Sequence, residues 1–219
     1  MKGVATVQQE SHSAKGWWYA RFRMQWAEET EPLWHIDLLL AHKVAAPLLR
    51  MCHEEILFWR FHRRAARDAE GHQFSLTFYS TPATAKRIFK DLRSDIIVRK
   101  MKREGLIIQD IYDDSARLSA PRVEDTSDGT WAPQIRKSWP FFIMGVCEMW
   151  LSLITEVSAT MPDQPKYSSL SKIIPYYERV NDAIKTLWRE QGAHSLLHHL
   201  NAIFGYEPVF VREVNLRRF

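Results

Sequence analysis

Hydrophobic and polar positions alternate along three short segments in the first half of the chain. Residues 17–24, 55–62 and 72–79 each place large apolar side chains at every second position. A period of two is the pattern of a β-strand with one buried face. A polar loop at 63–71 separates the last two segments, so we expect them to pair as an antiparallel hairpin.

A period of three to four residues between apolar positions replaces this alternation over residues 33–51. That spacing predicts an amphipathic helix, and Thr30-Glu31-Pro32 before it is a plausible helix start. Pro47 lacks a backbone donor and crowds the preceding turn. We therefore expect a kink or a split of this helix near Ala46.

A second helical region follows the predicted hairpin. Thr81 is a good N-cap, Pro82 suits the first helical position, and an apolar stripe continues to about Arg93. A further short helix ends before Gly105, and residues 106–112 form a fourth predicted strand.

The predicted order is strand, helix, strand, strand, helix, strand. This is the ferredoxin-like βαββαβ arrangement, an α+β fold with a four-stranded antiparallel sheet and helices on one face. Residues 135–158, 171–191 and 194–204 then read as helices, followed by a short extended tail at 208–219.

We divide the chain into four parts on this pattern. They are an N-terminal extension at 1–16, a ferredoxin-like unit at 17–113, a loop at 114–134 and a helical region at 135–219. We expect the helical region to pack on the sheet, so that the whole forms one compact domain.

Composition adds limits on the compartment and class of the protein. The chain has 219 residues, 46% hydrophobic residues, a formal net charge of +4 and only 2 Cys. Two cysteines cannot build a disulfide framework, and the first residues contain no apolar h-region, so we expect no signal peptide. The apolar stretch 139–154 is interrupted and short for a membrane span. We expect a bacterial cytoplasmic protein without a membrane partner.

Positive charge is concentrated in one region. Residues 58–103 contain twelve Lys and Arg against four Asp and Glu. Such a block is common on solvated helices, and it also attracts phosphate, so a nucleic-acid-binding module remains an alternative. The basic and aromatic RNP1 pattern of RNA-binding sheets is missing, which makes this the less favoured reading.

The alternation places polar and cationic side chains together on the face of the sheet opposite the helices. They are Arg21, Arg23, Arg60, His62, Gln73, Ser75 and Thr77. Guanidinium groups donate in a planar fork that suits carboxylate or phosphate. We expect either a site for an anionic substrate group or a solvated face.

Nine histidines raise the question of a metal. Among His194, His198 and His199, two imidazoles stand four residues apart on one helical face, but no third ligand completes a zinc set, so we expect buried or capping histidines and no metal. Cys147 reads as a core cysteine. No serine-hydrolase, P-loop or dinucleotide motif is present, and we expect no cofactor.

Residues 57–61, with the letters LFWRF, and residues 72–78, with HQFSLTF, resemble paired strands of a known family. Residues 195–205, with SLLHHLNAIFG, are similar to its closing helix. The family is the thiopeptide-type bacteriocin biosynthesis domain, also found as the C-terminal elimination domain of lantibiotic dehydratases.

The resemblance implies elimination of glutamate from a glutamylated precursor peptide. Arg60 matches the first arginine position of the family, whereas Ser75 and Thr77 stand at its next two arginines. His198 or His199 stands beside the register of the histidine on the family's last helix.

We therefore expect a stand-alone elimination-domain-like protein that acts in modification of a ribosomally synthesised peptide. Arg21 and Arg60 are expected to hold an anionic substrate group, with His62, His198 or His199 in proton transfer. The expected partners are a peptide substrate or a modifying enzyme, and a homodimer is possible. A non-enzymatic partner-binding or peptide-binding accessory protein is the main alternative.

Overall fold

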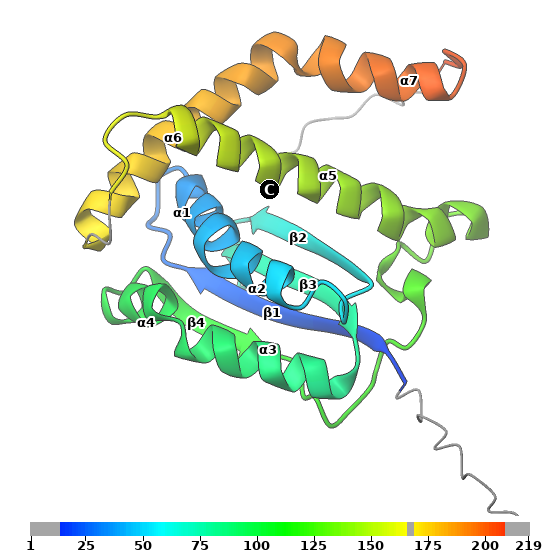
Figure 1. Ribbon diagram of the computed structural model, residues 1–219, viewed down its shortest axis with the longest axis horizontal. Coiled ribbons are helices and arrows are strands. Elements are labelled where there is room, and N and C mark those ends of the chain that lie inside the picture. Colours follow the sequence, from blue (N-terminus) through cyan, green and yellow to red (C-terminus); the bar gives the residue numbers. More distant parts are fainter. Residues whose placement is uncertain (1–13, 166–168, 209–219) are drawn as a thin grey trace, which may run out of the picture.

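Four strands form one antiparallel sheet in the computed structural model, which describes residues 14–165 and 169–208 (Figure 1). The strands are β1 (Gly16–Met24), β2 (Phe58–Ala65), β3 (His72–Ser80) and β4 (Ile107–Tyr112). Their order in the sheet is β2-β3-β1-β4, so β1 and β3 are central and β2 lies at an edge.

Helices connect the strands as the ferredoxin-like arrangement requires, and the α+β fold is confirmed. Between β1 and β2 lie α1 (Trp34–Leu39), the π-helical segment η1 (Leu40–Ala45) and α2 (Ala46–Met51). Between β3 and β4 lie α3 (Pro82–Ser94) and α4 (Ile96–Arg103). Both crossovers cover the same face of the sheet, because the apolar side chains of these helices share one core with that face.

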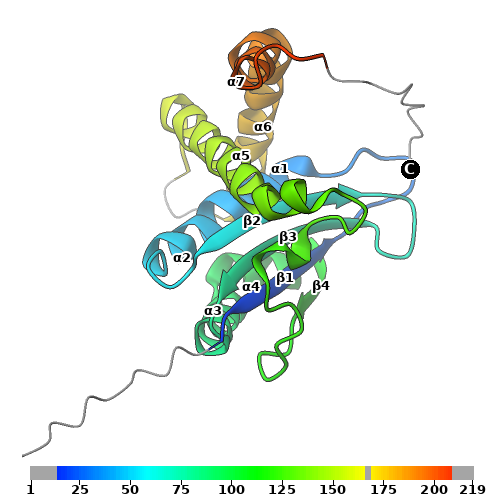
Figure 2. The same ribbon diagram turned by 90° about the vertical axis from the view of Figure 1, so that its right-hand side faces the viewer.

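The second half of the described chain is mostly helical (Figure 2). It contains the 3-10 turn η2 (Val123–Thr126), the long helices α5 (Pro133–Thr160) and α6 (Leu170–Gly192), the π-helical segment η3 (Ala193–His198) and α7 (His199–Ile203). The extended tail expected at 208–219 lies almost entirely outside the described residues.

Several local predictions are confirmed at the level of single residues. The Thr81 side chain caps α3 by accepting a hydrogen bond from the backbone N–H of Thr84 at 3.2 Å. Gly105 ends α4 with a φ of 75°, a conformation that glycine adopts without strain. The split expected near Ala46 is not found, because Ala45 and Ala46 keep helical dihedral angles; instead, the π-helical turns of η1 end at Ala45 and α2 begins at Ala46.

The predicted limits of the second strand are wrong by three residues at each end. The structure has β2 at Phe58–Ala65 instead of 55–62, so the hairpin loop begins after Ala65. The shift brings Arg63 into the strand, opposite Phe74 and on the helix-covered face of the sheet. A charged residue at this place needs a partner, and Asp37 of α1 supplies one.

Asp37, Arg63 and His72 form a buried ionic cluster between α1 and the sheet. Arg63 Nε donates to Asp37 Oδ2 at 2.9 Å, and His72 Nε2 lies 3.1 Å from Asp37 Oδ1. The side chains of Asp37 and His72 are fully buried. The Trp34 ring packs against both His72 and the Arg63 guanidinium, so the cluster is closed from solvent on its helix side. A charge buried this deeply is tolerated only because it is paired.

Helix α5 covers the free edge of β2. The Phe61 backbone N–H donates to Cys147 Sγ at 3.3 Å, and Cys147 is buried, as expected of a core cysteine. The edge of a sheet otherwise presents unpaired backbone groups to other chains. Burial raises the pKa of the Cys147 thiol, which keeps it protonated at neutral pH.

The length and hydropathy of α5 differ from the expectation for residues 139–154. The helix has 28 residues and contains an 18-residue window with a mean hydropathy of 1.5, only 17% of it buried. By length and composition alone it is able to cross a membrane, although core helices of other proteins pass the same test.

Replacing Asp37 with alanine is expected to lower the free energy of unfolding by about 3 to 5 kcal/mol, because the substitution leaves the half-buried Arg63 and the fully buried His72 without their carboxylate partner. Urea denaturation measures this change. Glu54→Ala is the control, since the Glu54 side chain is 86% exposed, and it should change stability by less than about 0.5 kcal/mol. Equal, small effects of both substitutions would contradict the role of the cluster.

A second prediction concerns His42, which forms a hydrogen bond of 2.9 Å with the Tyr177 hydroxyl. Burial lowers the pKa of His42 to about 4 from the usual 6.5, helped by Lys43 and Arg50. Below pH 6.5 His42 is protonated in the unfolded chain but stays neutral in the folded protein. The free energy of unfolding therefore decreases as the pH falls towards 4.

His42→Leu is therefore expected to lose less unfolding free energy than the wild type between pH 6.5 and pH 4, as measured by denaturation at several pH values. His53, whose side chain is 72% exposed, offers the control substitution His53→Leu. An unchanged pH profile in His42→Leu would show that His42 does not cause the loss.

Candidate functional site

The face of the sheet away from α1 to α4 carries polar side chains in regular rows, and we call it the open face. Thr77 of β3 pairs with Tyr19 of β1 on one side and with Arg60 of β2 on the other. The next row places Ser75 between Arg21 and His62. Directly paired residues on one face have Cβ atoms about 4.5–5.5 Å apart. The register therefore brings together side chains that are far apart in the sequence.

One end of the open face is closed by the chain that follows β4. Trp17 Nε1 donates to the carbonyl oxygen of Val123 at 2.9 Å, and the Tyr79 hydroxyl donates to that of Pro121 at 2.6 Å. Trp17, Phe58 and Tyr79 form a small apolar cluster under this cover. The helical region was expected to pack on the sheet, and on this face it does so through α5, whose Met144 packs against the cluster.

The remaining rows form what we call the cationic half of the open face. It consists of Tyr19, Arg21, Arg23, Arg60, His62, Arg64, Gln73, Ser75 and Thr77. The strand alternation predicted all of these except Tyr19 and Arg64, which share the face for the same reason. Arg64 was missed because the predicted strand ended at residue 62, two residues short of it.

Two donors in the cationic half are buried and have no partner. Thr77 is 0% exposed, and neither its Oγ1 nor Arg60 Nε accepts or donates a hydrogen bond within the described part of the chain. They lie on paired residues of adjacent strands. Buried polar groups are nearly always hydrogen-bonded in folded proteins. An acceptor atom of a ligand would supply the hydrogen bonds that these two neighbouring donors lack.

The arginines of this half differ in their carboxylate partners. Arg21 lies 3.8 Å from Asp113, and Arg64 pairs with Asp68 of the hairpin loop. Within the described residues, no ion pair involves Arg23 or Arg60. Their two charges are therefore uncompensated, which leaves the face cationic.

The positive charge of Arg60 affects the pKa values of two neighbours, Tyr19 and His62. Burial raises the pKa of Tyr19, and the neighbouring charge of Arg60 opposes this rise. The pKa of His62 is lowered from its usual 6.5 because the ring is partly desolvated against the sheet and because Arg60 and Arg64 are cationic neighbours. His62 is therefore neutral at pH 7 and has a ring nitrogen available to accept a proton.

The histidines of the C-terminal region lie elsewhere. His194, His198 and His199 gather on η3 and α7 with ring centroids 5.2 to 5.6 Å apart, beyond α6 and away from the sheet (Figure 1). They are exposed, so the expectation of buried or capping histidines is wrong. The structure thus brings His62 to Arg60, but it does not bring His198 or His199 there. Among the described residues, no group of three His, Cys, Asp or Glu side chains is arranged to hold a metal.

The basic block at 58–103 does not form a single surface. Arg63 is committed to Asp37, Arg87 pairs with Glu55, and Lys102 pairs with Asp110. Arg60 and Arg64 lie on the open face, whereas the cations of α3 and α4 lie on the helical side. A nucleic acid would therefore meet only part of this charge on any one side.

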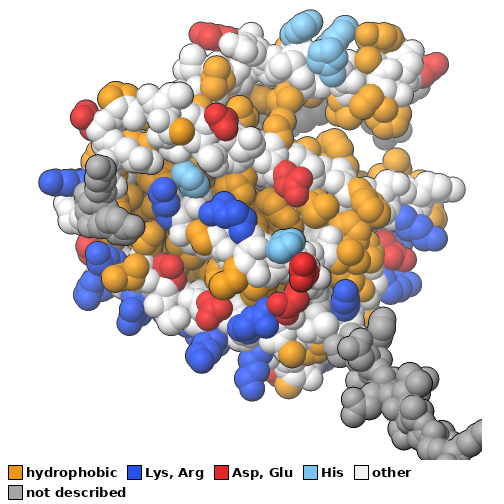
Figure 3. All heavy atoms as spheres, in the orientation of Figure 1, with side chains coloured by type: hydrophobic (Ala, Val, Ile, Leu, Met, Phe, Trp, Pro, Cys, Tyr) orange, Lys and Arg blue, Asp and Glu red, His pale blue; other side chains and the backbone are white. Residues whose placement is uncertain are grey.

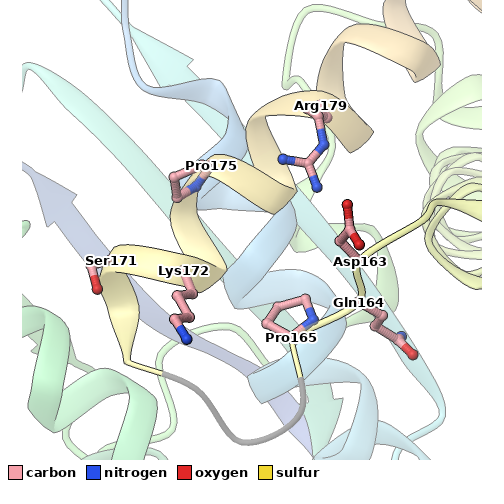
Figure 4. A pocket seen from close by; sticks show the side chains of 7 residues that line it. All are labelled: Asp163, Gln164, Pro165, Ser171, Lys172, Pro175 and Arg179. Carbon is pink, nitrogen blue, oxygen red and sulfur yellow. The ribbon is translucent and has the colours of Figure 1, made fainter.

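A surface hollow of about 520 Å³ lies beside the start of α6. Figure 4 shows Lys172 and Arg179 on one side of it and the side chain of Asp163 pointing towards Arg179. None of its lining side chains is buried. A built site needs groups held by the fold, so the candidate site remains on the sheet.

Arg60→Met is expected to raise the pKa of His62, because the substitution removes one of the two cations that oppose protonation of the ring. Titration of the His62 ring by NMR measures this shift. Lys90→Met, on the exposed side of α3, is the matched control and should leave the titration unchanged. A His62 pKa that stays the same in Arg60→Met would show that the two side chains do not interact.

Comparisons with protein-family models, with curated proteins and with solved structures find no match to this chain. The resemblance to the thiopeptide-type domain therefore stays a prediction.

Proposed function

We propose that this protein binds an anionic group of a peptide ligand on the cationic half of the open face, in modification of a ribosomally synthesised peptide. The main observation behind this proposal is the pair of unsatisfied donors on Arg60 and Thr77. Both are buried and unsatisfied, and they lie on directly paired residues of β2 and β3. A carboxylate or phosphate oxygen placed between them completes both groups.

The charge of the surroundings supports an anion over a neutral ligand. Arg23 and Arg60 have no carboxylate in an ion pair within the described residues, and Arg21 has one only at 3.8 Å. The apolar residues at the covered end of the open face are buried and take no part in this site. The sequence resemblance is the reason for expecting a peptide.

A second role, proton transfer, is favoured by His62. It is two residues from Arg60 on β2 and opposite Ser75, so its ring lies next to the bound anion of the proposal. Its lowered pKa keeps it neutral at pH 7, the form that accepts a proton. If a reaction takes place here, His62 is the base that the geometry supports, and His198 and His199 are not.

The proposal is tested by calorimetric titration of the full chain with a short peptide that contains glutamate, and with its glutamine counterpart. We expect the acidic peptide to bind more tightly. Arg60→Met is expected to weaken binding about tenfold or more, because a hydrogen bond to a charged group contributes about 1.5–3 kcal/mol. Thr77→Val is expected to weaken it less, since its hydroxyl is neutral.

Arg99→Met on α4 is the matched control, because it removes an exposed arginine outside the open face. It should leave the affinity unchanged. Equal affinity of Arg60→Met and the wild type would contradict the proposal. Tight binding of an oligonucleotide that depends steeply on salt and on Arg99, but not on Arg60, would instead support the nucleic-acid alternative.

A further inference from the structure

The two edges of the sheet differ in what covers them. The edge formed by β2 lies under α5, and its Phe61 N–H donates to Cys147 Sγ. The edge formed by β4 pairs with β1 on its inner side, and among the described residues no strand pairs with its outer side. We call this outer side of β4 the free edge. An uncovered strand edge presents a row of unpaired backbone N–H and C=O groups.

The pairing with β1 shows which residues of β4 direct their backbone groups to the free edge. The Asp113 N–H donates to the Tyr19 carbonyl oxygen at 3.1 Å. Hydrogen-bonded and non-hydrogen-bonded pairs alternate in an antiparallel ladder, so Ile111 also directs its backbone groups towards β1. Asp110 and Tyr112 therefore direct theirs outward. Within the described chain, no backbone hydrogen bond satisfies these outward N–H and C=O groups.

The groups at the free edge determine what kind of partner fits. An extended backbone has N–H and C=O groups at the spacing of a strand edge, and peptides bind to exposed sheet edges in this way. The ligand proposed above is a peptide, so this inference rests on the proposed function. Side chains of an added strand alternate between the two faces of the sheet. Every second one would lie on the open face, beside Gln109 and Ile111.

The surroundings of the free edge are basic. Arg93 of α3 lies over the Tyr112 ring, 4.3 Å from its centre, and takes part in no ion pair within the described residues. Asp110 is paired with Lys102 of α4. Helices α3 and α4 together contain eight Lys and Arg and one Asp, and Figure 3 shows Lys and Arg side chains gathered over them. Pairing with a second copy of β4 would bring two such basic sides together, whereas an acidic peptide is attracted by them.

The distance between the free edge and the cationic half sets the length of the ligand. A strand added at the free edge lies four strand spacings from β2, which is about 19 Å at about 4.8 Å per spacing. An extended chain covers this distance with about six residues. One peptide is therefore able to occupy the free edge with one segment and to reach Arg60 with an acidic side chain further along.

We propose that the free edge binds an extended acidic segment of the peptide ligand as an added strand. The outward backbone groups of Asp110 and Tyr112 hold this segment, and an acidic residue about six positions away reaches the cationic half. The free edge and the cationic half are separate contacts with one ligand, so each is tested by itself.

The test is calorimetric titration of the full chain with a glutamate-containing peptide of about twelve residues, long enough for a strand and the connecting segment. Single backbone nitrogens of the peptide are methylated, one position at a time. Only every second N–H of an added strand points to the sheet. We expect an affinity loss of about tenfold at alternate positions of one segment and little change between them. Losses that do not alternate, or no loss at any position, would overturn the proposal.

A substitution in the protein tests the same hydrogen bonds from the other side. Asp110→Pro removes one outward N–H, and proline is tolerated where a strand edge is free. We expect it to weaken binding of the peptide about tenfold. Asp110→Ala keeps the N–H and removes a carboxylate from the surroundings of an acidic ligand, so it should bind at least as tightly as the wild type. Equal affinities of the two variants would contradict the proposal.

Amide hydrogen exchange separates the peptide from a second copy as the occupant. Exchange of the Tyr112 N–H is expected to slow when the peptide is added, and to stay the same when only the protein concentration is raised. Slowing with protein concentration alone would overturn the proposal in favour of a second copy. Binding that depends on Arg60 but shows no alternation would overturn this inference and leave the proposed function intact. If no acidic peptide binds, both are wrong.

Discussion

The burial of Asp37 is the constraint on which the arrangement of the sheet depends. A carboxylate with no exposure must be paired, and it is paired with Arg63 and His72, which lie on the two strands of the hairpin. Arg63 must therefore face the helices. Because side chains alternate along a strand, this direction places Arg60, His62 and Arg64 on the open face. A slip of one residue in β2 would turn all of them inward and leave Asp37 without Arg63, its cationic partner on that strand.

The same orientation leaves one edge and one face of the sheet to be protected by the second half of the chain. Helix α5 lies along β2 and uses Cys147 as an acceptor for the Phe61 N–H, so the strand edge does not attract other chains. The segment after β4 seals Trp17 and Tyr79 through two hydrogen bonds to their polar atoms. What stays uncovered is the cationic half, which is therefore the part of the sheet left for a ligand.

The chemistry of that half follows from packing more than from charge alone. Long side chains of β1 and β2 lie over the short ones of β3, so Thr77 is buried although it belongs to an open face. Burial removes water as a partner and makes the unsatisfied Arg60 and Thr77 donors costly in the free protein. A ligand oxygen that accepts from both removes this cost, which is the physical basis for anion binding at this place. His62 lies on the same face, and its pKa is lowered by burial and by the neighbouring cations Arg60 and Arg64.

Local patterns in the sequence were sufficient for the order of the elements and for most of the candidate site. The period-two alternation assigned Arg21, Arg60, Ser75 and Thr77 to one face, and Thr81 marked the start of α3, because strand pleat and helix capping depend on neighbours a few residues away.

The limits of β2 and the distance of His198 from Arg60 were decided only in three dimensions. The first depends on a carboxylate twenty-six residues before Arg63, and the second on where α6 carries the end of the chain. Neither feature can be read from the periodicity of the sequence. Contacts between residues distant in the chain depend on burial and charge in the folded molecule, and not on their spacing along the chain.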